Sequence, residues 1–420
     1  MKKVSKISNM EALVRAPASK AHTLRGLIIG SLAEGTSVLS NPLLGEDQLN
    51  VIECLKQLGV GIEVSSDKII IEGSGGVFSP VVDELNVGES GVGMNFLSSV
   101  ANLCDKAVIL TGAKRITERP IFEVVDGLRQ LGCKIEYLGS EGFPPIKIDG
   151  GGIGGGVAEI RGDKTSQYFS SIVTSAPYAR EAVTLRCVDE MTEKPYFDIS
   201  LGMMSKFGIE VENDNYKEIK IAGGQKYSGI DLEVEGDYSS ASFFFLAAAI
   251  CQSKVTVSGL SEDTHQGDKG FLDLMAKMGC KVSATDEGIC VEGTGLAAIT
   301  VDMSDIPDLV PPAAIACGFA DGVSRLTGIG HLRHKECDRL AVMAAELNKM
   351  GIKAECGDDS LIIEGNRNCR GAVIDPHNDH RIAMSFAVAG LVTGEQVIED
   401  EMCVAKSFPD FWERFEIFHK

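Results

Sequence analysis

The sequence has no surplus of positive charge. Its 420 residues include 40 Lys and Arg against 60 Asp and Glu, which gives a formal net charge of −20. A protein that binds nucleic acid or an anionic membrane needs a basic face, because it must neutralise phosphates. The acidic balance therefore argues against both kinds of partner, and we expect small-molecule partners. In such a chain, a local cluster of Lys and Arg indicates a site for one particular small anion.

The sequence also lacks paired cysteines and long apolar runs. Its 12 cysteines show no C-x-x-C pair and no other metal-ligand spacing, so we expect reduced thiols, most of them in the core, and no metal site. The start, Met1-Lys2-Lys3, is not followed by the apolar segment of a signal peptide. The longest apolar run, residues 243–251, is far shorter than the roughly 20 residues that cross a bilayer. We therefore expect a cytoplasmic protein.

One pattern returns five times along the chain. It is an apolar-periodic helix that ends in Gly, followed by a short alternating strand. The glycines suit the left-handed residue that closes a helix, and intervals of 73, 76, 71 and 72 residues separate Gly59, Gly132, Gly208, Gly279 and Gly351. A sixth helix is predicted over residues 408–418. Because 420 residues are too many for one core, the pattern predicts an α+β protein with two domains of three units each.

The stretch 331–340, His-Leu-Arg-His-Lys-Glu-Cys-Asp-Arg-Leu, is dense in charge and leads into an apolar-periodic helix. Lys335 and Arg339 are four residues apart, so they would share one helix face. Like charges at this spacing repel by about 0.2–0.5 kcal/mol, and a bound anion would reverse the sign. Glu336 would place a possible proton donor beside them. A solvated helix start with internal salt bridges explains the stretch equally well.

Other predicted helix starts also carry cations, although the helix dipole favours acids there. At least five starts do so: Lys20 with Arg25, the segment 114–120, Lys335 with Arg339, Arg381, and Lys406. One convergent site for a multiply charged anion explains them together. The glycines at 88–93, the polar residues at 165–167 and Asp308 fit either ligand contacts or ordinary turns and caps. Gly150–Gly156 precedes a strand-like segment, which favours a flexible turn over a phosphate loop.

Nine segments together resemble, in order and over essentially the whole chain, the 5-enolpyruvylshikimate-3-phosphate synthase family. Those at 335–339, 378–381 and 406–409 are the most specific. The full set is Ser19–Arg25, Glu118–Pro120, Thr165–Gln167, Lys194–Tyr196, Glu235–Asp237, Gln266–Asp268, Arg333–Arg339, Asn378–Arg381 and Ala405–Pro409.

The resemblance implies an α+β fold of two domains. Each domain would hold three βαβαββ-like repeat units around a pseudo-threefold axis. The first would comprise residues 1–18 plus 235–420, and the second residues 19–234. The two crossings between them would form a hinge, and substrate would close the cleft to exclude water.

The resemblance also implies an activity. The enolpyruvyl (carboxyvinyl) group of phosphoenolpyruvate would move to the 5-hydroxyl of shikimate 3-phosphate by addition and elimination, with release of phosphate. No metal or bound cofactor is implied, and we expect a monomer. Arginine forks suit the carboxylate and phosphate of the donor.

Site residues carry over position by position from the family. The donor-binding set is Lys20, Gly91, Arg119, Gln167, Arg339, Arg381 and Lys406. The acceptor-binding set is Arg25, Thr165, Ser166, Gln167, Tyr196, Asp308, His331 and Lys335. The resemblance makes Asp308 the candidate base for the hydroxyl and Glu336 the candidate proton-transfer residue. Lys20 and Lys406 would stabilise the developing charge.

The acceptor side departs from the family pattern at Ala21, Glu89, Val92, Asn95, Glu193 and His331. Glu193 matters most, because the family has Ser there, close to the acceptor phosphate. Two anions 4 Å apart repel by about 4 kcal/mol at an effective dielectric constant of 20. An alternative therefore stands beside the main hypothesis. The chain would use phosphoenolpyruvate with a different acceptor, one that lacks the phosphate or carries an amine.

Three further alternatives follow from the same residues. One is a non-catalytic paralogue that binds the donor without turnover. A second is the related transferase that acts on UDP-N-acetylglucosamine, but no long loop with a reactive Cys precedes Arg119. Cys337 and Cys403 lie near site motifs and suit buried packing better. RNA 3′-phosphate cyclases share the repeat unit, yet the acidic charge and the segment Lys335–Arg339 argue against one.

Overall fold

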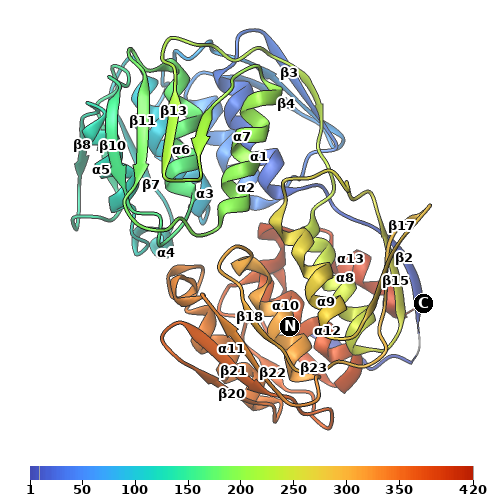
Figure 1. Ribbon diagram of the computed structural model, residues 1–420. Helices are drawn as coiled ribbons and strands as arrows, with labels where there is room; N and C mark the ends of the chain where they lie inside the picture. Colours follow the sequence, from blue (N-terminus) through green and yellow to red (C-terminus); the bar gives the residue numbers. More distant parts are fainter. Residues whose placement is uncertain (9, 420) are drawn as a thin grey trace. The chain divides into compact units, whose positions relative to one another are not determined.

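The computed structural model describes residues 1–8 and 10–419, and the chain divides into two compact units. The central unit comprises Ala18–Val234. The terminal unit comprises Met1–Pro17 and Glu235–Lys420. Figure 1 draws the central unit from blue to yellow-green and most of the terminal unit from yellow to red.

The central unit holds three four-stranded sheets with one shared topology. In each sheet the first pair of strands is parallel and the other two pairs are antiparallel. The orders are β14 (Asp231–Glu233), β3 (Thr36–Ser40), β5 (Lys68–Glu72), β4 (Gly61–Val64); β6 (Glu84–Asn86), β7 (Val108–Thr111), β9 (Ile146–Ile148), β8 (Ile135–Tyr137); and β10 (Gly156–Ile160), β11 (Val183–Cys187), β13 (Glu218–Ile221), β12 (Glu212–Asp214). Its helices are α1 (Lys20–Leu32), α2 (Glu46–Gln57), α3 (Gly91–Val100), α4 (Lys114–Thr117), α5 (Phe122–Gln130), α6 (Gln167–Ser175) and α7 (Lys194–Lys206).

The terminal unit repeats this topology. Its sheets are β2 (Glu11–Arg15), β15 (Lys254–Ser258), β17 (Gly288–Glu292), β16 (Lys281–Thr285); β18 (Thr300–Asp302), β19 (Val323–Thr327), β21 (Ser360–Glu364), β20 (Lys353–Cys356); and the shorter β22 (Val373–Ile374), β23 (Gln396–Ile398), β1 (Lys2–Val4). The N-terminal strands β1 and β2 thus pair with strands from the C-terminal half. The helices are α8 (Tyr238–Ile250), α9 (Gly270–Lys277), α10 (Val310–Gly318), α11 (Arg339–Lys349), α12 (His380–Thr393) and α13 (Phe411–Phe415).

The predicted repeat is confirmed, and its glycines behave as expected. All five have φ between 84° and 113°, the region that a residue with a Cβ rarely adopts. A strand follows each of them. The sixth helix is shorter than predicted: α13 begins at Phe411 and gives way to a 3-10 turn at Glu416–His419. The reason is tertiary packing, because Phe408 and Phe418, at the two ends of the predicted helix, both pack on Phe244 of α8, with ring centroids 6.0 and 5.9 Å apart.

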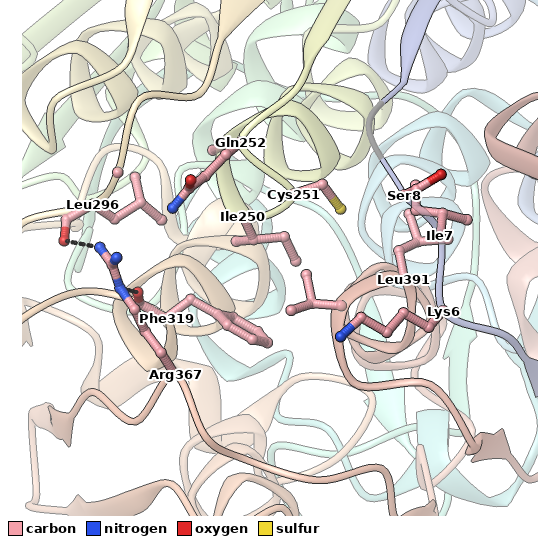
Figure 2. A pocket seen from close by; sticks show the side chains of 13 residues that line it. Lys6, Ile7, Ser8, Ile250, Cys251, Gln252, Leu296, Phe319, Arg367 and Leu391 are labelled. Atoms are coloured by element: carbon pink, nitrogen blue, oxygen red, sulfur yellow. Dashed lines mark hydrogen bonds between the residues drawn. The ribbon is translucent and has the colours of Figure 1, made fainter.

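Three helices at the centre of the terminal unit determine where its candidate site lies. The helices α8, α10 and α12 pack against one another, and every residue of α8 and α10 is buried. Helices that are apolar on all sides belong inside a core, so only their ends can present polar groups. Their C-terminal ends surround a small cavity (Figure 2). In the chain outside residues 9 and 420, no helix has both the length and the apolar character needed to cross a bilayer.

Candidate active site

The starts of the central helices bring polar groups together in the terminal unit. Asp237 caps α8 by accepting from Ser240 N at 2.6 Å. Asp379 caps α12 by accepting from Arg381 N at 2.9 Å. These caps satisfy amides that a helix start leaves without partners. The 3-10 turn Pro307–Leu309, which holds Asp308, leads into α10. Three helix starts therefore meet around Asp308.

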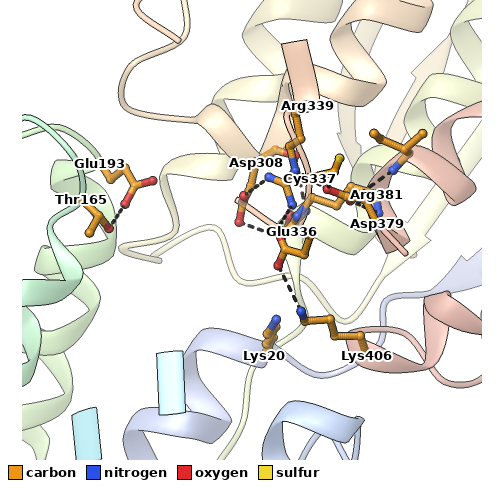
Figure 3. Close-up of polar contacts among 12 residues, drawn as sticks. Lys20, Thr165, Glu193, Asp308, Glu336, Cys337, Arg339, Asp379, Arg381 and Lys406 are labelled. Carbon is orange, nitrogen blue, oxygen red and sulfur yellow. Dashed lines mark hydrogen bonds and ion pairs between the residues drawn. The ribbon is translucent and has the colours of Figure 1, made fainter. Parts of the chain in front are cut away.

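Arg339 is the most heavily paired side chain of this cluster (Figure 3). It is 1% exposed. Its Nε lies 2.7 Å from Asp379 Oδ2, its Nη1 2.8 Å from Asp308 Oδ1 and its Nη2 2.9 Å from Glu336 Oε2. Burial opposes the charged guanidinium, but the carboxylates outweigh burial and hold the pKa of Arg339 well above its usual range. A buried charge is tolerated only with such pairing.

Asp308 bridges two arginines. Its Oδ1 accepts from Arg339, and its Oδ2 lies 2.8 Å from Arg381 Nη2. Arg381 Nη1 donates to Ser239 Oγ, at the start of α8. Burial raises the pKa of Asp308, but Arg381, Arg339 and Lys335 outweigh it and hold that pKa far below the usual range. A general base works best with a pKa near the operating pH, so Asp308 is a poor base in this arrangement.

Glu336 links the arginines to a lysine. Its Oε2 accepts from Arg339, and its Oε1 lies 3.4 Å from Lys406 Nζ. Lys406 is buried at the end of the 3-10 turn Glu401–Lys406. The terminal unit therefore brings together Asp308, Glu336, Arg339, Arg381 and Lys406 of the predicted site.

The expectation that Lys335 and Arg339 share a helix face is wrong. Helix α11 begins at Arg339, because Asp338 caps it by accepting from Ala341 N at 3.1 Å. Lys335 precedes the helix with extended backbone and follows a 3-10 turn that contains His331. The internal salt bridges considered for this stretch do form. One, between Arg339 and Glu336, is buried, and the other, between Arg333 and Asp338, lies at the partly exposed surface.

In the central unit, Lys20 and Gly91 both begin helices. Ser19 caps α1, and Lys20 Nζ lies 2.5 Å from Asp47 Oδ2, a carboxylate that is 2% exposed. Gly91 begins α3, where a Cβ would lie only 2.5 Å from Arg119 Nη1. The missing side chain therefore makes room for the Arg119 guanidinium. Arg119 is half-buried. It follows a short helix, α4.

Arg25 is a buried cation whose partners are neutral. It is 3% exposed. It donates to Ser200 Oγ at 2.7 Å, Ala21 O at 3.1 Å and Tyr196 O at 2.7 Å. Burial lowers the pKa of Arg25 to about 10, so the side chain stays charged at neutral pH. Across residues 1–8 and 10–419, neither Arg25 nor Arg119 forms a salt bridge. A buried cation with neutral partners favours an anionic ligand nearby.

Residues at the start of α6 donate hydrogen bonds to Glu193. Thr165 Oγ1 donates to Glu193 Oε2 at 2.5 Å (Figure 3). Ser166 Oγ donates to Glu193 O at 2.9 Å. Glu193 is 2% exposed and has a left-handed φ of 57° just before α7. Gln167 accepts from Asn95 Nδ2 at 3.0 Å. Both hydroxyls predicted to bind the acceptor are thus already donors to Glu193.

Sequence reasoning gave no role to three residues that support the predicted ones. Asp379 holds Arg339, Ser239 accepts from Arg381, and Asp47 pairs with Lys20. Asp379 lies inside the segment Asn378–Arg381, but the sequence of that segment does not show that its carboxylate meets Arg339. Ser239 and Asp47 carry no signal in the sequence beyond a place near a helix start. Burial raises the pKa of the Cys337 thiol well above its usual range, which agrees with packing and not with nucleophilic chemistry.

Repeated α+β units with Lys and Arg at buried helix starts define the enolpyruvyl (carboxyvinyl) transferase class of fold. Within that class, the chain belongs to the family of EPSP synthase (3-phosphoshikimate 1-carboxyvinyltransferase), which it matches over residues 4–415. The fold class and the family predicted from the sequence are both confirmed.

Curated relatives and solved structures agree with this assignment. The 3-phosphoshikimate 1-carboxyvinyltransferase of Methanoculleus marisnigri is 41% identical over 414 residues, 98% of this chain and 97% of the relative. The protein of the same name from Shewanella amazonensis is 41% identical over 413 residues, 97% of this chain and 96% of the relative. The structure of EPSP synthase from Acinetobacter baumannii matches with a TM-score of 0.82 and 29% identity, covering 98% of this chain and 96% of that one.

Proposed function

We propose that this chain transfers the carboxyvinyl group of phosphoenolpyruvate to the 5-hydroxyl of shikimate 3-phosphate and releases phosphate. The relatives are named for this transfer. The observation that carries the proposal is the pair of buried arginines, Arg339 and Arg381, which both donate hydrogen bonds to the carboxylate of Asp308. Guanidinium N–H groups in this geometry are suited to the carboxylate of phosphoenolpyruvate.

The donor would replace internal carboxylates. Asp308 occupies one nitrogen of each arginine at 2.8 Å, and Glu336 occupies another nitrogen of Arg339 and approaches Lys406. An incoming donor carboxylate therefore displaces Asp308, and the donor's further negative charge displaces Glu336. Asp379 stays on Arg339, because its second oxygen also caps α12. The displacement keeps every buried cation paired.

This exchange would prepare the chemistry. Arg381 and Arg339 keep Asp308 ionised, so an anion that takes both arginines raises the pKa of Asp308 toward a useful value. Asp308 then accepts the proton of the acceptor hydroxyl while the hydroxyl oxygen bonds to the central carbon of the donor. Glu336 delivers a proton to the methylene carbon. In the elimination, the new methyl group returns one proton to Glu336, the double bond re-forms and the carbon–oxygen bond to phosphate breaks, and Asp308 passes its proton to the departing phosphate.

The central unit would supply the remaining contacts. Lys20, Gly91, Arg119 and Gln167 are assigned to the donor substrate. The acceptor set of the central unit is Arg25, Thr165, Ser166, Gln167 and Tyr196, and the terminal unit adds Asp308, His331 and Lys335. Arg119 meets no carboxylate competitor among residues 1–8 and 10–419. The closure that would bring both sets to one donor stays a prediction, as do monomeric state and cytoplasmic location.

A second candidate function differs only in the acceptor. The buried carboxylate of Glu193 accepts from Thr165, one of the hydroxyls assigned to the acceptor phosphate. A phosphate brought to about 4 Å from that carboxylate would be repelled by roughly 4 kcal/mol at an effective dielectric constant of 20. An acceptor that lacks the phosphate, or carries an amine, would avoid this repulsion.

Phosphate release decides between the candidates. The protein is incubated with phosphoenolpyruvate and either shikimate 3-phosphate or shikimate, and released phosphate is measured. Turnover with shikimate 3-phosphate supports the first candidate, and turnover with shikimate alone supports the second. Donor binding without turnover on either acceptor leaves a non-catalytic paralogue. The variant Arg370→Gln changes an exposed cation that forms no salt bridge in the described chain, and its turnover should match that of the unmodified protein.

A further inference from the structure

A cavity of the terminal unit lies at the end of the central helices opposite to the arginine cluster. Helix α8 begins beside Ser239 and ends at Ile250, and α12 begins beside Arg381 and ends just after Leu391. The ends of both helices line a cavity of about 290 Å³ (Figure 2). A helix of 13 residues is about 20 Å long at 1.5 Å per residue. The cavity is therefore separate from the arginine cluster.

The floor of this cavity is apolar. Ile250, Leu296, Phe319 and Leu391 all line it, and Figure 2 shows Ile250 and Phe319 lying between Arg367 on one side and Lys6 on the other. Ligand pockets range over about 300–1,000 Å³, so this one lies at the small end. It would hold a compact body with apolar surface on one face.

The rim of the cavity is positively charged. Lys6 and Arg367 line it, and none of its 13 lining residues is Asp or Glu. The chain as a whole has a net charge of −20, so a pocket lined by two cations and no acidic residue differs in charge from the rest of the protein. Such a local surplus attracts an anion.

The two cations, Arg367 and Lys6, differ in their hydrogen-bond and salt-bridge partners. Arg367 donates to Phe319 O at 3.3 Å and Leu296 O at 3.5 Å, and it lies 3.2 Å from the exposed carboxylate of Asp321. The ammonium of Lys6 has no hydrogen bond or salt bridge within the part of the chain that the structure describes. Lysines near helix ends often complement the helix dipole, but Lys6 donates to no carbonyl of α8 or α12. The Lys6 ammonium, at the exposed rim of the cavity, is therefore available to a ligand.

We propose that this cavity binds a small monocarboxylate with a flat apolar body. The carboxylate pairs with Lys6, and the body rests on Ile250, Phe319 and Leu391. Gln252, which has a left-handed φ of 51° and lines the same cavity, offers an amide to the second carboxylate oxygen. A phosphorylated sugar-like acid is excluded by the apolar floor, so the ligand belongs to a different class from the substrates of the proposed function.

Calorimetric titration of the full chain with 3-phenylpropionate tests the proposal. The matched neutral probe is 3-phenylpropan-1-ol, which keeps the body and loses the charge. We expect the carboxylate to bind about tenfold more tightly than the alcohol, because charge-assisted hydrogen bonds are lost with the alcohol. Lys6→Gln should remove most of that difference, whereas Arg370→Gln, outside the cavity, should leave it unchanged.

Methyl NMR spectra locate the bound probe without relying on any variant. The methyl signals of Ile250 and Leu391 should shift on addition of 3-phenylpropionate, while those of Leu27, in the core of the central unit, should not. Equal affinity for acid and alcohol, or shifts confined to other methyl groups, overturns the proposal. Failure to bind at millimolar concentration also overturns it. None of these outcomes bears on phosphate release from phosphoenolpyruvate, so the proposed function is tested separately.

Discussion

The two units hold the arginines of their predicted sites in opposite ways. In the terminal unit, Arg339 and Arg381 are tied to carboxylates of the protein. In the central unit, Arg25 donates only to neutral oxygens, and Arg119 forms no salt bridge among the described residues. A ligand anion must displace an internal carboxylate to pair with Arg339 or Arg381, whereas no carboxylate has to leave Arg25 or Arg119. The comparison separates arginines that would exchange partners from arginines that are open to an anion.

The largest expected effect is on stability. Arg339→Gln leaves Asp379 and Asp308 with less pairing in a buried setting, which typically costs about 3–5 kcal/mol of unfolding free energy. Arg25→Gln removes hydrogen bonds to neutral acceptors only, and we expect a loss of about 1–3 kcal/mol. Urea unfolding of both variants measures the difference. Equal losses would mean that the two arginines are not held in different ways.

The next effect concerns the acceptor. Glu193→Ser removes the buried carboxylate beside Thr165, so affinity for shikimate 3-phosphate should rise at least about tenfold, within the roughly 4 kcal/mol that the repulsion allows. The KM of the acceptor is the measurement. Glu190→Ser is the matched control, since Glu190 is 86% exposed and lies three residues earlier. An unchanged KM in Glu193→Ser would show that the acceptor phosphate does not approach this carboxylate.

A smaller effect is expected at Gly91. An alanine Cβ there would press on the Arg119 guanidinium, and overpacking of this kind costs about 1–3 kcal/mol. The KM of phosphoenolpyruvate should rise about tenfold with little change in KM of the acceptor. Gly270→Ala begins a helix where the nearest atom to a Cβ is 3.7 Å away, and it should behave like the unmodified protein. A rise in both KM values alike would point to general damage.

The smallest expected effect is the uptake of protons when phosphoenolpyruvate binds. Asp308 has a lowered pKa without the donor, and loss of its arginines should raise that pKa. Donor binding should therefore take up a fraction of one proton and tighten as pH falls, in the window between the two pKa values of Asp308. Calorimetry in buffers of different ionisation enthalpy measures the uptake. Asp308→Asn should abolish the part due to this carboxylate, and unchanged uptake in that variant would contradict the exchange mechanism.

Periodicity was enough to predict the repeats. Gly59 and its four counterparts close helices by positive φ, a property of a single residue that local sequence reveals. The segment Asn378–Arg381 is also recognisable from local sequence as a helix start, because Asp379 caps the helix that follows it. Features of this kind involve one residue or span two or three, and they need no knowledge of the rest of the chain.

Partners of the charged side chains could not be predicted in this way. Arg339 meets Asp308 and Asp379 from positions 31 and 40 residues away, and Arg381 meets Ser239 from 142 residues away. The sequence also suggested a helix containing Lys335, which is wrong because Asp338 caps α11 one residue before Arg339. Long-range pairing of this kind depends on how helices pack and not on their own residues.

By itself, the sequence determined the α+β repeat, the family and the identities of the charged residues at helix starts. These are local or pattern properties, written in spacing and residue type. Only the tertiary structure decided that the terminal unit's arginines are already occupied by carboxylates while Arg25 is not. That distinction arises when three buried helices bring their starts together, because a charge removed from water must take whatever partner the packing provides.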